Sequence, residues 1–432
     1  MKKFLLIVLI LAIASFAFAS GNRQQQQSAA ASGDVISIWS IQVDGKSPQT
    51  TRASIARFEA ANPGIKVNLT LIPNDNYKAL LAVAMAAGTT PDLFISWSGG
   101  PMYEYANNNQ ILDLTSYMNA HPAFKNKLLD AGIAQGTYNG KIYGVPSTNV
   151  SPATVFYNKE IFQRLNLRVP TTVAELETVS DTLKANGITP FSLANLTQWT
   201  GSMYFMYLAT RHGGTQPFIS AVDGSGSFTH PAFIYAGQKI QEWVNKGYFL
   251  PGFNGFDWDS GQGRPPLYRG ETAMLLMGSW FVAQAKDESP EFYSKMGTFA
   301  FPRVDGGSGN PATVIGTIGD NFYHVNAASR NPAKAFELIT YLLDDQGVKD
   351  MVAEGKIPPV KGLTFDDPIL REVMNQVNNA PDIQLWYDQS LSPEVAEVHK
   401  VTSQEIFGLT KTPDAAAQEL QNAQQAYIRR NR

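Results

Sequence analysis

The chain has 432 residues, more than a single hydrophobic core usually organises, so its length predicts two domains. It is 44% hydrophobic and 16% charged, which is typical of a folded globular protein and excludes extended disorder. The formal net charge is −3 and there is no long basic run, so we expect neither nucleic acid nor an anionic membrane surface as a partner.

The N-terminus has the pattern of a secretory signal. Two lysines precede an apolar run at residues 4–13, and Ala17-Phe18-Ala19 supplies a small-x-small cleavage pattern, which predicts a signal peptide over residues 1–19. Residues 20–33 are polar and of low complexity, and they predict a flexible linker. Cysteine is absent, so disulfides and lipidation at cysteine are not expected. We therefore expect an exported protein of the periplasm or another extracytoplasmic part of the cell envelope.

Short apolar runs alternate with helical stretches over the first hundred residues after the linker. The pattern predicts strands at 35–39, 66–72 and 93–96 and helices at 47–61, 76–87 and 102–107. This β-α-β-α-β order predicts a parallel sheet with right-handed crossovers. Ligands of open α/β sheets bind outside the carboxyl ends of the strands, so side chains that follow the strands are candidate ligand contacts.

The rest of the chain is richer in helices. Short strands are predicted at 142–146, 154–157 and 273–277, and a further strand at 313–325. Thr172 and Glu175 have the spacing of a capping box and predict a helix start, and Asn158 precedes another. Residues 201–250, a helix at 331–343 with Pro332 at its first position, and the C-terminal segment are predicted to be helical.

Motifs for catalysis or metal binding are incomplete. Residues 40–47 (SIQVDGKS) end like a phosphate-binding loop, but Ser40 occupies the place of the motif's first glycine. Residues 257–261 (DWDSG) resemble a calcium loop, but Tyr268 stands where the bidentate glutamate is needed. The five histidines lack the spacing of a zinc site, and there is no Gly-x-Ser-x-Gly elbow. We expect no metal and no cofactor.

The tryptophans fall into two groups. Trp39 lies within a strand and Trp243 has helical spacing from Ile240, so both are interpreted as core residues. The other five stand beside polar residues or glycine near strand ends and loops, and they are Trp97, Trp199, Trp258, Trp280 and Trp386. An indole covers the apolar C–H face of a sugar ring, while Asp, Asn and Gln side chains bind the hydroxyls. These five predict an aromatic sugar-binding cleft, and Gln42 and Asp44, after the first strand, are candidate hydrogen-bonding partners.

Several stretches carry a family resemblance in their order and spacing. They are RFEAANPGIKV (57–67), AGTTPDL (87–93), VFYNKE (155–160) with VPTT (169–172), GETAM (270–274) with GSWF (278–281), and more weakly NPAKAF (331–336). Over nearly all of residues 34–432 the chain resembles the extracellular sugar-binding proteins of ATP-binding-cassette importers, the maltose-binding-protein-like group. The resemblance implies a non-catalytic, monomeric receptor that binds a carbohydrate. The ligand is an oligosaccharide if each tryptophan covers one ring. The expected partners are the membrane permease subunits of an importer.

The resemblance also implies an α/β fold of the two-lobed periplasmic-binding-protein type, with discontinuous lobes joined by a multi-crossing hinge. We place the first lobe at 34–149 and 312–347 and the second at 150–311 and 348–432. The expected crossings lie near 147–153, 309–313 and 346–356.

The resemblance assigns site residues position by position. The tryptophan of the Gly-Ser-Trp segment, Trp280, is expected to stack on sugar, and the loop after the Pro-Asp strand contributes Trp97 and Ser98. Aromatic positions of the family match Trp199 and Trp386, and position alone suggests Gln42, Asn149, Asn321 and Asp388.

Two other readings remain open from the sequence. A secreted carbohydrate-active enzyme would need a carboxylate pair roughly 5–10 Å apart in the same cleft. A receptor for a peptide or a polyamine would present several acids and fewer stacking rings.

Overall fold

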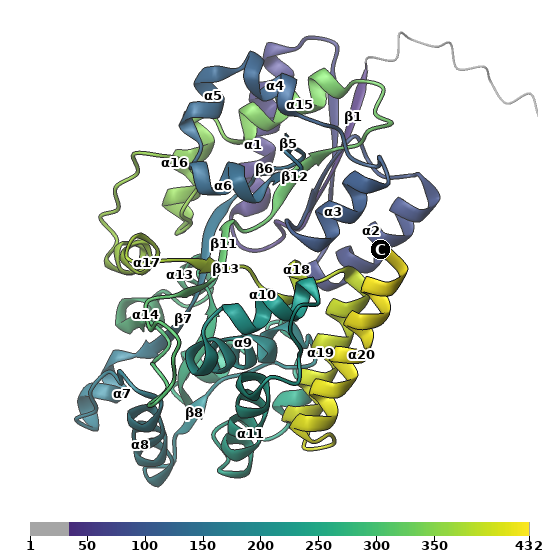
Figure 1. Cartoon of the computed structure of the whole chain (residues 1–432). Coiled ribbons are helices and arrows are strands. Elements are labelled where there is room, and N and C mark those ends of the chain that lie inside the picture. The colour runs from purple at the N-terminus through teal and green to yellow at the C-terminus, as the bar shows by residue number, and fades with distance from the viewer. Residues whose placement is uncertain (1–33, 432) are drawn as a thin grey trace, which may run out of the picture.

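The computed structural model describes residues 34–431, so the predicted signal peptide (1–19) and the whole predicted linker (20–33) lie outside the described residues. Over this part of the chain, two large sheets and two separate hydrophobic cores form an upper and a lower lobe with the hinge strands between them (Figure 1). No helix in the described range has the length and apolar character that a membrane span requires.

The first lobe is built on a five-stranded sheet of order β2-β1-β3-β12-β6. Its strands are β1 (Val35–Ser40), β2 (Lys66–Leu71), β3 (Leu93–Ser96), β6 (Val145–Pro146) and β12 (Phe322–Val325). The predicted parallel pairing of the first three strands is confirmed, because β1 pairs in parallel with both β2 and β3. The sheet is mixed overall, since β12 runs antiparallel to β3 and to β6.

Helices and one small hairpin complete the first lobe. They are α1 (Ser47–Ala61), α2 (Asn74–Ala87), α3 (Gly100–Asn107), α4 (Thr115–Ala120), α5 (Pro122–Lys127), α6 (Asp130–Gln135), α15 (Pro332–Leu342), α16 (Asp345–Glu354), and the hairpin of β4 (Thr137–Tyr138) and β5 (Lys141–Ile142). Pro332 occupies the first turn of α15, as predicted.

The second lobe is built on a six-stranded sheet around the long strand β7 (Asn149–Asn158). The order is β13-β11-β7-β9-β8, and β10 also pairs with β7. The partner strands are β8 (Thr189–Phe191), β9 (Thr272–Gly278), β10 (Met296–Phe299), β11 (Val314–Gly319) and β13 (Ile383–Gln384). Nine of the ten residues of β7 are buried, because strands and helices cover it on all sides.

Most helices of the chain belong to this second lobe. They are α7 (Lys159–Arg164), α8 (Val173–Ala185), α9 (Trp199–Gly213), α10 (Gln216–Asp223), α11 (Pro231–Asn245), η1 (Phe253–Gly255), α12 (Pro265–Tyr268), α13 (Phe281–Glu288), α14 (Pro290–Lys295), α17 (Pro368–Asn378), α18 (Tyr387–Ser390), α19 (Pro393–Phe407) and α20 (Pro413–Asn431). The predicted capping box is confirmed at α8: Thr172 Oγ1 accepts from the Glu175 N–H, and the Glu175 carboxylate accepts from the Thr172 N–H.

The two tryptophans interpreted as core residues pack as expected. Trp243 is fully buried in the second core and its indole N–H donates to Glu177 at 2.8 Å. Trp39 is half-buried against the first core, with its ring edge-on to Tyr77.

The chain passes between the lobes at residues 147–148, between β6 and β7, and again at Asp320 and Asn321, between β11 and β12. The second passage corrects two predictions: the single strand at 313–325 and the crossing near 309–313. Gly319 (φ +142°) and Asp320 (φ +59°) break the extended backbone, and the two halves pair with different sheets. Residues 314–319 therefore belong to the second lobe, not to the first-lobe segment predicted at 312–347.

The third passage also lies later than predicted. Val348 and Met351 of α16 pack in the first core, and Arg57 of α1 forms an ion pair with Asp344 at 2.6 Å. This packing holds α16 on the first lobe, although residues from 348 onward were assigned to the second. After α16, Ile357 belongs to the second core, but Val360 still packs in the first core and bridges to Leu128. From Phe365 onward the buried apolar residues belong to the second core, so the passage spans residues 355–365.

Candidate ligand-binding cleft

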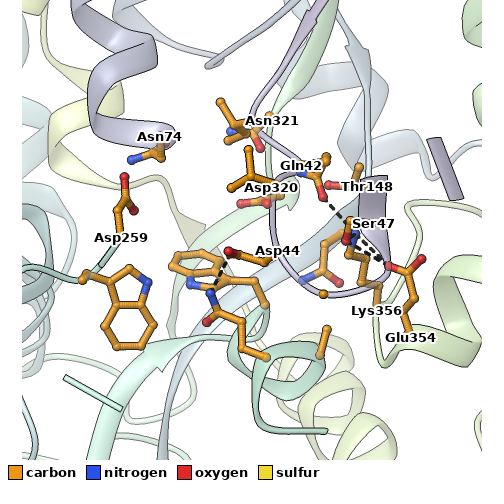
Figure 2. Close-up of a pocket in the computed structure, with 18 of the residues that line it drawn as sticks. Gln42, Asp44, Ser47, Asn74, Thr148, Asp259, Asp320, Asn321, Glu354 and Lys356 are labelled. Carbon is orange, nitrogen blue, oxygen red and sulfur yellow. Dashed lines mark hydrogen bonds and ion pairs between the residues drawn. The ribbon is translucent and has the colours of Figure 1, made fainter. Parts of the chain in front are cut away.

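A cavity lies between the lobes and takes its lining from both (Figure 2). The loop after β1, the start of α2 and the end of β3 line it from the first lobe, and the starts of α9, α13 and α18 line it from the second. Hinge residues close its inner end. Ten of the eleven predicted site residues line this cavity: Gln42, Asp44, Trp97, Asn149, Trp199, Trp258, Trp280, Asn321, Trp386 and Asp388.

Ser98 is the predicted site residue that does not line the cavity. It is 1% exposed, because the chain after Trp97 presses against the backbone of residues 389–391. A Cβ on Gly100 would lie 1.9 Å from the Leu391 carbonyl oxygen, so only glycine allows this approach. The loop is therefore closely packed at this point, and the assignment of Ser98 as a ligand contact is corrected.

Four tryptophans of the second lobe form a continuous aromatic surface, which we call the tryptophan wall. Trp258 and Trp280 each lie against Trp199, with ring centroids 6.2 and 6.0 Å apart, and Trp386 lies 6.0 Å from Trp280. The rings meet at steep angles of 57–74°, the edge-on geometry that aromatic pairs favour. Trp199 and Trp280 are half-buried, while Trp258 and Trp386 are buried.

Trp97 is the aromatic contribution of the first lobe. It follows β3, is 8% exposed, and packs edge-on against Tyr77 at 6.1 Å. The Lys78 ammonium lies 4.8 Å from the centre of its ring, within the range of a cation–π contact. Trp97 is therefore both a lining residue and a part of the first core.

A buried polar network lies behind the loop after β1. The Lys356 ammonium donates to Gln42 Oε1 at 2.8 Å and to Ser47 Oγ at 2.7 Å, and it lies 3.2 Å from the Glu354 carboxylate (Figure 2). Sequence reasoning found Gln42 but missed Lys356 and Glu354, which follow it by more than 300 residues and show no motif of their own. Asp44, on the same loop, accepts from the Gln284 side chain of α13 at 2.9 Å.

At the hinge, Asn149 and Asn321 have different surroundings. Asn149 Nδ2 donates to Ser279 Oγ at 2.9 Å, and Asn149 Oδ1 accepts from the Ile357 N–H at 2.6 Å. Asn149 thus joins two crossing segments to the second lobe. By contrast, Asn321 Oδ1 and Thr148 Oγ1 are buried and have no hydrogen-bond partner among the described residues. Buried polar atoms nearly always have partners, so these two atoms are free to bind ligand.

Contacts between the lobes show that the cleft is closed. The Asp259 carboxylate accepts from the Asp75 N–H at the start of α2 at 2.9 Å, and Trp199 Nε1 donates to the Asp75 carboxylate at 3.3 Å. The Lys78 ammonium and the Asp388 carboxylate form a longer ion pair at 3.6 Å. Each of these contacts joins α2 of the first lobe to the second lobe.

Two lining carboxylates titrate well above their ordinary range. Burial raises the pKa of Asp259 to about 6, and the neighbouring charges of Asp75 and Asp257 add to this shift. Burial likewise raises the pKa of Asp320 to about 6, although the Lys356 charge opposes the shift. Burial also raises the pKa of Asp75. Burial therefore disfavours the charged form of each of these carboxylates.

Two lobes that close on an aromatic cleft, with the chain passing repeatedly between them, define a two-lobed solute receptor. The family model described as bacterial extracellular solute-binding protein matches residues 44–349, and the chain belongs to this family. This membership confirms the fold class and the family resemblance found in the sequence motifs.

Relatives and solved structures agree with the family. The chain is 26% identical over 396 residues to an ABC transporter extracellular-binding protein of Pyrococcus horikoshii, covering 88% of this chain and 85% of that one. It is 25% identical over 354 residues to the multiple sugar-binding protein of Streptococcus mutans, covering 80% of each. A solved structure from a study of xylan utilization by Caldanaerobius polysaccharolyticus is similar at 31% identity and a TM-score of 0.84, covering 90% of this chain and 99% of that one.

Proposed function

We propose that this protein is an extracytoplasmic receptor that binds an oligosaccharide between its lobes and delivers it, as a monomer, to the permease subunits of an ABC-type sugar importer. The observation that carries the proposal is the tryptophan wall, which faces carboxylates and amides of the first lobe and the hinge across one cavity. Relatives named as sugar-binding and as ABC transporter extracellular-binding proteins support it.

The proposed binding mode follows from the chemistry of the two walls. Indole rings cover the apolar faces of sugar rings, and several adjacent indoles suit several linked rings. Asp44, Asp320 and Asn321 offer acceptors for the hydroxyl groups. A ligand that contacts both walls favours the closed form, because it binds that form more tightly than the open one.

A thermal-shift screen against mono- and oligosaccharides tests the proposal. At a ligand concentration of about 100 times the dissociation constant, binding stabilises the folded protein by roughly 2.7 kcal/mol. We expect an oligosaccharide to raise the melting temperature of the wild type, and to raise that of Trp280→Ala much less. If no carbohydrate stabilises the wild type, the proposal is wrong.

A carbohydrate-active enzyme is the second candidate, because Asp259 and Asp320 have pKa values raised to about 6, as a general acid of a glycosidase requires. We propose that the protein turns over no sugar. Steady release of shorter saccharides by pure protein, lost in Asp259→Asn or Asp320→Asn, would favour the enzyme. Because carboxylates line the cleft, spermidine and short peptides belong in the same thermal-shift screen, where stabilisation by these alone would favour a non-sugar receptor.

A further inference from the structure

Acidic residues outnumber basic residues in the lining of the cleft. Four lysines line it, Lys46, Lys78, Lys286 and Lys356, and no arginine is among the described lining residues. Seven acidic residues line it: Asp44, Asp259, Asp287, Glu288, Asp320, Glu354 and Asp388. What matters for a ligand is which of these charges already have partners.

The lysines are largely committed to the protein. Lys356 is 9% exposed, and its three N–H groups face three acceptors, on Gln42, Ser47 and Glu354. Lys78 pairs with Asp388 and covers Trp97. Lys286 donates to the Ala353 carbonyl at 3.0 Å. Lys46 is exposed, as is Asp44 in the same loop, so water and salt screen both charges.

Several of the acids, by contrast, have no cationic partner. Asp44, Asp259 and Asp320 form no ion pair within residues 34–431. Burial and the neighbouring charges of Asp75 and Asp257 raise the pKa of Asp259, so further negative charge close to it is disfavoured. Burial raises the pKa of Asp320, in the passage between β11 and β12, against the opposing charge of Lys356.

The uncharged polar atoms of the lining favour the same kind of ligand. Asn321 Oδ1, Gln389 Oε1 and Gln284 Oε1 are buried, lack partners among the described residues, and accept hydrogen bonds only. A sugar hydroxyl donates to such an atom or to a carboxylate. In a uronic acid the carboxylate replaces the hydroxyl at C6 and has no proton to donate, so an acceptor that faces this position is left unpaired.

From this imbalance, and resting on the carbohydrate receptor proposed above, we propose that the cleft selects uncharged oligosaccharides and excludes those that carry carboxylates. The unpaired Asp259 and Asp320, together with the exposed Asp44, disfavour the anionic ligand, and two of the four lining lysines, Lys78 and Lys356, already pair with Asp388 and Glu354.

Titration calorimetry with sterically matched pairs tests the proposal. The pairs are galactotriose with trigalacturonic acid and cellotriose with cellotriouronic acid. In each acid a carboxylate replaces the CH₂OH group of every ring. We expect at least one neutral member to bind and its acidic counterpart to bind about 100-fold more weakly at low salt, as repulsion by two or three nearby carboxylates implies. Raising the salt to about 0.5 M is expected to narrow the difference.

Asp44→Asn and Asp259→Asn separate charge from shape, because each keeps an acceptor of the same size. Asp259→Asn is expected to reduce the ratio of neutral to acidic affinity by about tenfold, as removal of one repelling charge implies. Asp44→Asn is expected to reduce it by less, because Asp44 is exposed and its charge is screened. Asp113→Asn, outside the cleft and paired with Lys141, is the matched control and leaves the ratio unchanged.

Three outcomes overturn the inference in different ways. If an acidic member binds as well as its neutral partner, the selectivity proposal fails while the carbohydrate receptor stands. If the difference survives both aspartate substitutions and high salt, shape and not charge discriminates, and the proposal is wrong. If neither these pairs nor any other saccharide binds, the proposed function fails and this inference fails with it.

Discussion

The two walls of the cleft are built from different residue types. The second lobe contributes the tryptophan wall of Trp199, Trp258, Trp280 and Trp386, which rests on the larger hydrophobic core. The first lobe contributes one tryptophan, Trp97, and otherwise the polar loop after β1 and the start of α2. The second lobe is thus a stacking surface and the first lobe a set of hydrogen-bonding groups. A sugar is expected to bind the tryptophan wall first, in the open form, and the first lobe then closes over its hydroxyls.

The largest effect is expected from the tryptophan wall. Replacing Trp280 by alanine should weaken sugar binding by about 2–4 kcal/mol, or roughly 30- to 1000-fold, the range for a central aromatic anchor. The free energy of unfolding without ligand should change little, because Trp280 is half-buried against the core and not enclosed by it. Calorimetric titration and apo melting curves measure the two quantities.

Trp243→Ala is the control for this experiment. Trp243 is fully buried in the same lobe, so its truncation should cost about 3–5 kcal/mol of folding free energy and leave the cleft intact. If Trp280→Ala behaves like Trp243→Ala, melting far lower yet binding sugar normally once folded, the contrast between the walls is wrong.

Trp97→Ala is expected to lower both sugar affinity and the stability of the apo protein, and to lower affinity less than Trp280→Ala does. Trp97 lines the cleft but is 8% exposed and packs against Tyr77, so the substitution removes core packing as well as ligand contact. We expect affinity to fall by about tenfold or more and the apo melting temperature to fall too, unlike for Trp280→Ala. An unchanged melting temperature would show that both tryptophans are purely ligand-facing.

The carboxylates at the contact between α2 and the second lobe predict that sugar affinity depends on pH. Closure raises the pKa of Asp259 from its ordinary 3.8 to about 6, so the closed form binds a proton more readily than an open, solvated one. Affinity should therefore rise as the pH falls from about 6 towards 4, and stay level above that window. Asp259→Asn, which keeps an acceptor for the Asp75 N–H, should reduce the slope. Affinity that falls as the pH is lowered through this window would contradict the geometry.

The smallest effect on sugar affinity is expected from a substitution that removes a direct contact between the two lobes. Gln284→Ala removes the 2.9 Å hydrogen bond to Asp44, which joins α13 to the loop after β1. A single net hydrogen bond contributes about 0.5–1.5 kcal/mol, so affinity should fall roughly 2- to 10-fold through a less stable closed form. Fluorescence titration resolves this change. A loss as large as that of Trp280→Ala would mean that direct contact between Gln284 and the sugar outweighs the hydrogen bond to Asp44.

Local signals explain which elements the sequence predicts well. The capping box at Thr172 and Glu175 and the buried strand at 93–96 depend on residues close together in the chain, and both are present in the structure. Ten of the eleven site residues proposed from the sequence line one cavity. Aromatic side chains beside polar residues at strand ends are themselves a local signal.

Long-range packing explains what the sequence could not predict. The break at Gly319 and Asp320 is hidden in an apolar run, and only pairing with two different sheets reveals it. Lys356 becomes part of the cleft because it donates to Gln42 and Ser47, which precede it by 314 and 309 residues. Ser98 is turned inward by the backbone of residues 389–391, which no motif near it indicates.

A crystal structure with the tightest-binding oligosaccharide of the thermal-shift screen tests the central claim most directly. The account predicts closed lobes, sugar rings stacked on Trp199 and Trp280, and hydroxyls donating to acceptors such as Asp44 and Asn321. A sugar bound outside the cleft, or one held in it without contact to the tryptophan wall, would contradict the account.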